Sequence, residues 1–289
     1  MNFKTAEELL KICESEGLSI SEVMIQREVT EGESEREDVL NRMRRAFEIM
    51  KDSATRAIDN PQKSMGGLLG GQAQKLSRHA GSEKTACGKL VAKAIAYAMG
   101  VLEVNAQMGL IVAAPTAGSA GVIPGTMLAL QEEYDFTDDQ IVTALFNTGA
   151  IGYLAMRNAT VSGAVGGCQA EIGVAAAMAA SAAVELLGGT PAQSLDAAST
   201  VLMNMLGLVC DPVGGLVEYP CQNRNASGVV NALAATEMTM AGISQLIPFD
   251  EMLDIMYKVG RDLPVSLRET ALGGCAASES ACAACGACN

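Results

Sequence analysis

The sequence has no Trp, one His, and only 5 Tyr and 5 Phe among its 289 residues. Basic residues are also scarce: 20 Lys+Arg stand against 33 Asp+Glu, which gives a net charge of −13. Because a phosphate backbone is bound by clustered Lys and Arg, and no such cluster is obvious, we expect no nucleic-acid partner. The most apolar stretch, Ile172 to Leu187, is shorter than the roughly 20 residues of a membrane span. We expect no membrane segment, and the lack of an apolar leader favours a cytoplasmic protein.

The scarcity of aromatic residues also constrains the fold. Hydrophobic residues make up 49% of the chain, so the core must be filled mainly by Ala, Leu, Val, Ile, Met and Gly. Ala, Leu and Met favour helices, whereas the β-branched and aromatic residues of sheets are comparatively few. The composition therefore predicts an all-α protein with a compact body rich in Ala, Gly and Met.

The distribution of charge divides the chain into three parts. Residues 1–60 carry 9 basic and 14 acidic side chains and are predicted to form a charged N-terminal helical arm. Residues 61–270 are predicted to form the helical body, because Arg157 is the only basic residue between Ala94 and Asn223. Residues 271–289 are rich in Ala, Gly, Ser and Cys and are predicted to be a tail.

Apolar periodicity and capping residues predict where the helices lie. Thr5 is expected to cap a first helix that ends near Gly17, and Ser19 or Ser21 to cap a second. Further helices are expected at 34–58, 84–109, 137–156, 170–187, 191–208, 228–245 and 249–259. Residues 75–81 are expected to form a polar loop.

Nine cysteines in a reducing compartment favour metal ligation over disulfides. Cys168, Cys210 and Cys221 lie in or beside Gly-rich loops of the apolar body. Such loops suit an iron–sulfur cluster because they free backbone N–H groups and let inorganic sulfur approach the chain. The alternative is that these three are ordinary buried thiols.

The C-terminus offers a competing set of thiols. Cys275 is followed by Cys282-x-x-Cys285-x-x-Cys288, a spacing that suits a ferredoxin-type cluster or a zinc site. A Cys-bearing tail without metal is the alternative. A third interpretation joins both sets: three core thiolates hold three irons of a [4Fe–4S] cluster, and a tail Cys closes the fourth, open iron reversibly.

Two Gly-rich loops are candidates for binding a small anionic substrate. The segment 115–121 places Thr116, Gly118 and Ser119 near an expected helix start, which favours a carboxylate. The loop that contains Ser64, Gly66 and Gly67 offers similar donors. The alternative for each loop is a plain tight turn, and no nucleotide-binding motif is present.

Groups that can act as a general base are few. His79 is the only His, and it is either a base or a surface residue. This thin supply of bases indicates that part of the active site belongs to another chain.

Taken together and in this order, the 115–121 segment, the Ser64-Met65-Gly66-Gly67 loop and the three cysteine loops resemble the alpha chain of the iron–sulfur-dependent bacterial L-serine dehydratases. The resemblance covers nearly the whole chain. It implies an all-helical catalytic domain, a [4Fe–4S] cluster, and conversion of L-serine to pyruvate and ammonia. It also implies a separate beta chain, and hence a hetero-oligomer, because the length matches the two-chain form of the family.

The resemblance assigns roles to particular positions. Cys168, Cys210 and Cys221 match the cluster ligands. Cys288 is the candidate for the C-terminal Cys that approaches the cluster, with Cys285 as the alternative. The candidates for substrate binding are Ser64, Gly66, Gly67, Thr116, Gly118 and Ser119. The base that removes the α-proton is His79 or a residue of the beta chain, which we favour.

Two other functions remain open from the sequence alone. A dehydratase that uses pyridoxal phosphate needs a Schiff-base lysine beside a Gly-rich loop, and Lys63 is the one such residue. An electron-transfer subunit would instead carry its cluster on the tail cysteines.

Overall fold

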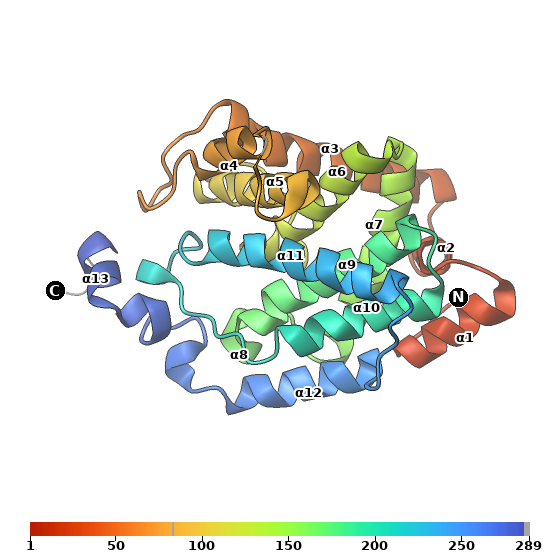
Figure 1. Cartoon of the computed structure of the whole chain (residues 1–289). Coiled ribbons are helices and arrows are strands. Elements are labelled where there is room, and N and C mark those ends of the chain that lie inside the picture. The colour runs from red at the N-terminus through yellow and green to blue at the C-terminus, as the bar shows by residue number, and fades with distance from the viewer. Residues whose placement is uncertain (83, 286–289) are drawn as a thin grey trace.

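The computed structural model describes residues 1–82 and 84–285, and this part of the chain forms helices and no β-strand (Figure 1). The predicted all-α class is confirmed. The first seven helices are α1 (Ala6–Glu16), α2 (Ile20–Glu31), α3 (Arg36–Asp59), α4 (Gln72–Ala80), α5 (Gly88–Ala106), α6 (Val122–Tyr134) and α7 (Asp138–Asn158). The remaining six are α8 (Gly163–Gly166), α9 (Val174–Leu186), α10 (Pro191–Asn204), α11 (Cys221–Met240), α12 (Phe249–Asp262) and α13 (Glu279–Cys285). None of these helices combines the length and the apolar character that a membrane span requires.

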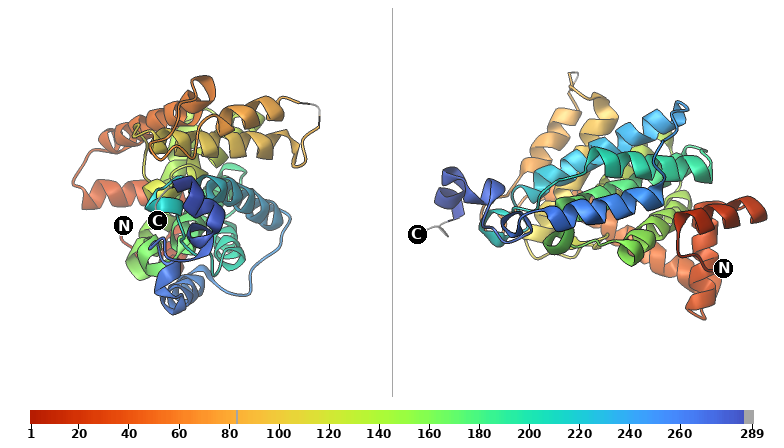
Figure 2. Two further views of the ribbon diagram at one scale, coloured as in Figure 1. Left: turned by 90° about the vertical axis from the view of Figure 1, so that its left-hand side faces the viewer. Right: turned by 90° about the horizontal axis from the view of Figure 1, so that it is seen from below.

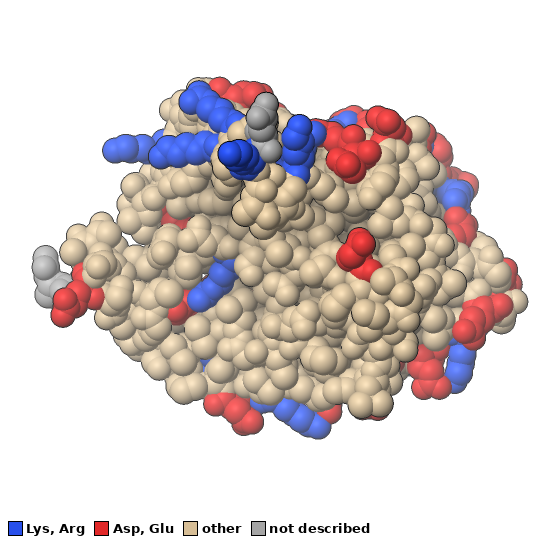
Figure 3. All heavy atoms as spheres, in the orientation of Figure 1, with Lys and Arg blue, Asp and Glu red and all other residues tan. Residues whose placement is uncertain are grey.

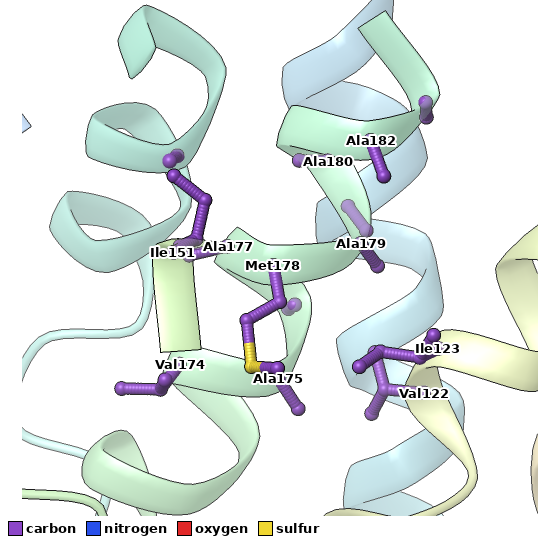
Figure 4. Close-up of a cluster of buried hydrophobic side chains, with 14 of the residues drawn as sticks. Val122, Ile123, Ile151, Val174, Ala175, Ala177, Met178, Ala179, Ala180 and Ala182 are labelled. Carbon is purple, nitrogen blue, oxygen red and sulfur yellow. The ribbon is translucent and has the colours of Figure 1, made fainter. Parts of the chain in front are cut away.

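Helix α9 forms the centre of the core. Every residue from Val174 to Val184 is buried, and α6, α7, α10 and α11 pack around this helix. Figure 4 shows Ile151 of α7 and Ile123 of α6 on different sides of the alanines of α9. An alanine surface lets neighbouring backbones approach closely, so this core is dense without large aromatic side chains.

Glycines allow equally close contacts between α3, α5 and α6. A Cβ atom added to Gly100 of α5 would overlap the carbonyl oxygen of Ala54 in α3. A Cβ atom on Gly125 of α6 would lie 2.7 Å from the carbonyl oxygen of Ala94 in α5. These glycines are needed for space rather than for unusual backbone angles.

Residues 1–60 pack against the rest of the molecule rather than standing apart from it. Phe3, Leu9, Ile20 and Ile25 are fully buried and belong to the same core as the residues of α9. The charged side chains of this segment cover its outer side.

Helices α4, α8 and α13 were not expected from the sequence, whereas for α6 only a helix start near residues 115–121 was expected. Residues 72–80, part of which was expected to be a polar loop, form α4, so that expectation was wrong. Helix α6 contains Pro124 and Gly125, but Pro124 lies in the first turn, where a missing N–H group removes no helical hydrogen bond. The described part of the C-terminal segment forms the short turn η5 (Gly274–Ala277) and α13, which lie at the end of the molecule opposite to α1 (Figure 2).

Candidate functional site

Three buried thiols from separate segments converge at one end of the helical body. Cys168 lies between α8 and the turn η2 (Gln169–Gly173), Cys210 follows α10, and Cys221 is the first residue of α11. Their exposed fractions are 4%, 4% and 8%. Gly167, directly before Cys168, has a φ of 75°, a conformation that favours glycine and turns the chain into the site.

The three thiols are close enough to influence one another's ionisation. Burial raises the pKa of Cys168 and of Cys221 to about 12, and the negative charge of Glu171 adds to the effect on both. Burial also raises the pKa of Cys210, with further contributions from Cys168, Glu171 and Cys221. The metal-free chain therefore keeps these groups protonated, and a cation that binds them as thiolates must displace protons.

Glu171 links the cysteines to the first candidate substrate loop. Its carboxylate accepts a 2.7 Å hydrogen bond from the Thr116 hydroxyl, and the Sγ atom of Cys210 lies 3.6 Å from its other oxygen. Burial raises the pKa of Glu171, while the hydrogen bond from Thr116 acts in the opposite direction. Glu171 was not predicted from the sequence to belong to this site. The sequence did contain a signal: Glu171 lies three positions after Cys168, in a segment expected to be buried. A buried carboxylate needs hydrogen-bond or ionic partners, so its presence there indicates a site.

Arg224 is the basic side chain whose charge acts on the thiols of Cys168 and Cys221. Its guanidinium group pairs with Asp211 at 2.5 Å and donates to the carbonyl oxygen of Val209 at 2.7 Å. Burial acts to lower the pKa of Arg224, but the negative charges of Cys168 and Asp211 outweigh it and raise the pKa. Arg224 thus offers a fixed positive charge beside groups that become anionic when they bind a metal.

The C-terminal segment packs onto the loop that carries Cys210. The backbone N–H of Cys275 donates to Asp211 at 2.6 Å, and a Cβ atom on Gly214 would lie 3.2 Å from the Cβ of Cys285. The thiol of Cys275 is exposed and that of Cys285 is half-buried. Cys288, the predicted fourth cysteine of the site, lies outside the described residues.

The Thr116 turn has donors that the chain itself does not use. Thr116 and Ser119 bond to each other through their side chains and backbone around the turn η1 (Ala117–Ser119). Asn225 of α11 donates to the carbonyl oxygen of Gly118 at 2.7 Å and so fixes the turn against the Cys221 segment. Among the described residues, the backbone N–H groups of Ala117 and Gly118 have no acceptor.

The second candidate loop is, in contrast, satisfied internally. Glu218, three residues before Cys221, accepts hydrogen bonds from the Ser64 hydroxyl at 2.6 Å, from the Gly66 N–H at 2.6 Å and from the Leu68 N–H at 3.1 Å. The N–H of Gly67 donates to the carbonyl oxygen of Ser64. The loop therefore binds a carboxylate, and in this structure that carboxylate belongs to Glu218.

A second buried carboxylate holds the end of the same loop. Glu103 of α5 is fully buried and accepts hydrogen bonds from the N–H groups of Gly71 and Ala73 at 2.9 and 2.8 Å. Gln222, next to Cys221, donates to the same carboxylate at 3.1 Å. Glu103 and Glu218 together tie the loop to the start of α11.

The structure separates His79 from these groups. His79 is exposed in the last turn of α4, whose first turn is the part that contacts Glu103. A nine-residue helix is about 13 Å long, so the side chain stands well away from the loop. Lys63 is exposed beside Ser64.

The donor set of this site is of the kind that an iron–sulfur cluster takes. No group of three His, Cys, Asp or Glu side chains in the described ranges is arranged to hold one metal ion. Three buried thiols on three loops, with Arg224 to balance the negative charge, provide soft ligands of the kind that such a cluster takes.

Comparison with known proteins identifies related sequences. A family model described as the serine dehydratase alpha chain matches residues 15–276. The chain is 47% identical to a probable L-serine dehydratase alpha chain of Bacillus subtilis, over 96% of this chain and 92% of the relative. It is 42% identical to an L-serine dehydratase alpha chain of Peptoniphilus asaccharolyticus, over 95% and 94% of the two chains. An L-serine dehydratase of Streptomyces coelicolor is 37% identical, but the match covers only 60% of that longer protein.

Proposed function

Because the chain belongs to the serine dehydratase alpha chain family, we propose that it is the alpha chain of a two-chain, iron–sulfur-dependent L-serine dehydratase that forms pyruvate and ammonia. The observation that carries the proposal is the convergence of Cys168, Cys210 and Cys221, three buried thiols on three loops, beside the Thr116 turn.

In this proposal Cys168, Cys210 and Cys221 hold a [4Fe–4S] cluster, and three ligands leave one iron open. That iron supplies a Lewis acid for the serine hydroxyl, which is otherwise a poor leaving group. Arg224 offsets the negative charge of the three thiolates. Asp211 holds Arg224 in place through their ion pair.

The substrate carboxylate is assigned to the Thr116 turn. The unpaired N–H groups of Ala117 and Gly118 are suited to bind a carboxylate, and Glu171 orients Thr116 beside them. Ser64, Gly66 and Gly67 stay candidates from the sequence, but their donors are used by Glu218 and by the loop itself. Their proposed role is to support the start of α11.

The base that removes the α-proton is assigned to the beta chain. His79 is the only His and is exposed in the last turn of α4, at the end of that helix remote from the Ser64 loop. A partner that covers the open end of the site is a source of the missing group and excludes water from the reaction.

The test is anaerobic purification with the beta chain, followed by iron and sulfide analysis and a pyruvate assay on L-serine. We expect about four irons per alpha chain. Cys168→Ala, Cys210→Ala and Cys221→Ala are each expected to lose both the cluster and the activity. Cys13→Ala is the matched control, because Cys13 is equally buried but lies in α1.

Two results would contradict the proposal. Pyruvate formation without iron would exclude the cluster mechanism, and trapping of a Lys63 adduct with borohydride would favour pyridoxal phosphate instead. If all three Cys→Ala variants keep their iron, and removal of residues 275–289 abolishes it, the cluster is bound by the tail cysteines.

A further inference from the structure

The fold gathers unpaired basic side chains at the end of the molecule formed by α4 and α5. Residues 60–102 contain six Lys and Arg residues and one acidic residue, although the whole chain carries −13. Figure 3 shows Lys and Arg gathered over this end, while most of the rest of the visible face is uncharged. We define the basic ridge as Lys75, Arg78, Lys84 and Lys89, all of which are exposed.

The members of the basic ridge have no ionic partners within the described chain. None of the four forms an ion pair with a residue that the structure describes. In contrast, six of the nine basic residues in 1–60 do: Lys11, Arg27, Arg36, Arg44, Lys51 and Arg56. Like charges placed side by side without partners repel one another. This arrangement is therefore more favourable when an acidic surface covers it.

An apolar groove adjoins the basic ridge at the start of α5, although none of the four ridge side chains lines it. It has a volume of about 280 Å³ and runs between the start of α5, the end of α6 and the middle of α11. Its lining is mostly apolar and includes Leu90, which follows Lys89 in α5, and the partly exposed Val230 of α11. The exposed Glu237 of α11 is the one charged residue in the lining. An apolar centre with a charged rim is the usual composition of a protein–protein interface.

The relatives indicate what covers this surface. The longer relatives named L-serine dehydratase carry about two-fifths of their length outside the region that this chain matches, whereas the relatives named alpha chains are matched over nine-tenths or more. In a two-chain enzyme the remaining part must bind without a covalent link. Resting on the proposed function, we propose that the groove between α5, α6 and α11, with the basic ridge at its rim, is the docking site of the beta chain, which presents an acidic surface around an apolar anchor.

Charge complementarity makes this site specific among the surfaces of an acidic chain. An acidic partner is repelled by the net negative charge of the chain and attracted by the basic ridge, which raises the association rate at low salt. The affinity of the wild-type chain for the beta chain is therefore expected to fall as the salt concentration rises.

The test measures binding of the purified beta chain to the full-length alpha chain by isothermal titration calorimetry, at about 50 mM and about 300 mM salt. The double variant Lys84→Glu/Lys89→Glu is expected to bind about tenfold more weakly at low salt, and its affinity should no longer fall with salt. Arg42→Glu/Arg45→Glu is the matched control, because both residues are exposed on α3, have no ion pair, and give the same change in net charge. A second variant, Val230→Asp, is expected to weaken binding at both salt concentrations, because it places a charge in the groove.

Equal affinities for the ridge variant, the control and the wild type would overturn the proposal. If Val230→Asp abolishes self-association of the alpha chain but leaves binding of the beta chain intact, the groove binds a second copy of this chain. That result would also overturn the proposal. Failure of the proposed function gives a different result: the beta chain binds with the expected salt dependence, but the complex lacks iron and forms no pyruvate from L-serine.

Discussion

Replacement of Glu218 tests whether one buried carboxylate holds the Gly-rich loop to the start of α11. In Glu218→Ala the Ser64 hydroxyl and the N–H groups of Gly66 and Leu68 lose their acceptor. Ser64 is 7% exposed, whereas Gly66 is exposed and Leu68 half-buried, so water replaces the lost partner at only part of the site. With about 1–3 kcal/mol for each buried donor left unsatisfied, we expect a loss of about 3 kcal/mol in the free energy of unfolding.

The variant Glu218→Gln refines this expectation. Its amide keeps one oxygen acceptor but turns an NH₂ group toward another donor, so a loss of about 1–2 kcal/mol is expected. The assay is urea unfolding of the metal-free chain followed by circular dichroism, with Glu133→Gln as the control, because Glu133 is exposed on α6. If Glu218→Ala unfolds within about 0.5 kcal/mol of the wild type, the carboxylate does not hold the loop and the reasoning fails.

Two further predictions concern packing and pH. Gly100→Ala is expected to cost about 1–3 kcal/mol in unfolding free energy, because its methyl group meets the carbonyl of Ala54. Gly149→Ala in α7, where no close contact exists, should instead stabilise the chain by about 0.5–1 kcal/mol, and a loss there would contradict the packing argument. Folding raises the pKa of Glu171 above its ordinary value of 4.5, so ionisation of this group opposes folding as the pH rises. Glu171→Gln should therefore make the metal-free chain more stable than wild type at pH 8 but not at pH 4, as measured by urea unfolding at both pH values; equal stability at pH 8 would refute it.

The helices were predictable where an apolar pattern and a capping residue coincided. Thr5 and Ser19 cap α1 and α2 as expected, and α9 was expected from an uninterrupted apolar run. Helix α4 was missed because its exposed polar residues resemble a loop, and only the start of α6 was expected because Pro124 and Gly125 usually interrupt helices. In both cases tertiary contacts determine that the segment is helical. Glu103 fixes the start of α4, and Gly125 lets α6 approach α5.

The candidate site was predictable in its residue types but not in its connections. The convergence of Cys168, Cys210 and Cys221 was an expectation from loops and from family resemblance, and the structure brings the three together; their role as ligands stays a prediction. Glu171 and Glu218 were not identified as part of the site. A single acidic residue in an apolar segment shows that a partner is needed, but only the fold reveals that these partners are Thr116 and the Ser64 loop.

The position of Cys210 constrains the order of events during synthesis of the protein. Its backbone N–H and carbonyl groups pair with Leu267 and Glu269, close to the C-terminal end of the chain. Synthesis of the chain through α12 already produces Cys168, Cys210 and Cys221, but the Cys210 loop still lacks its backbone partners. A product truncated after α12 would therefore carry all three cysteines without the segment that fixes the Cys210 loop in place.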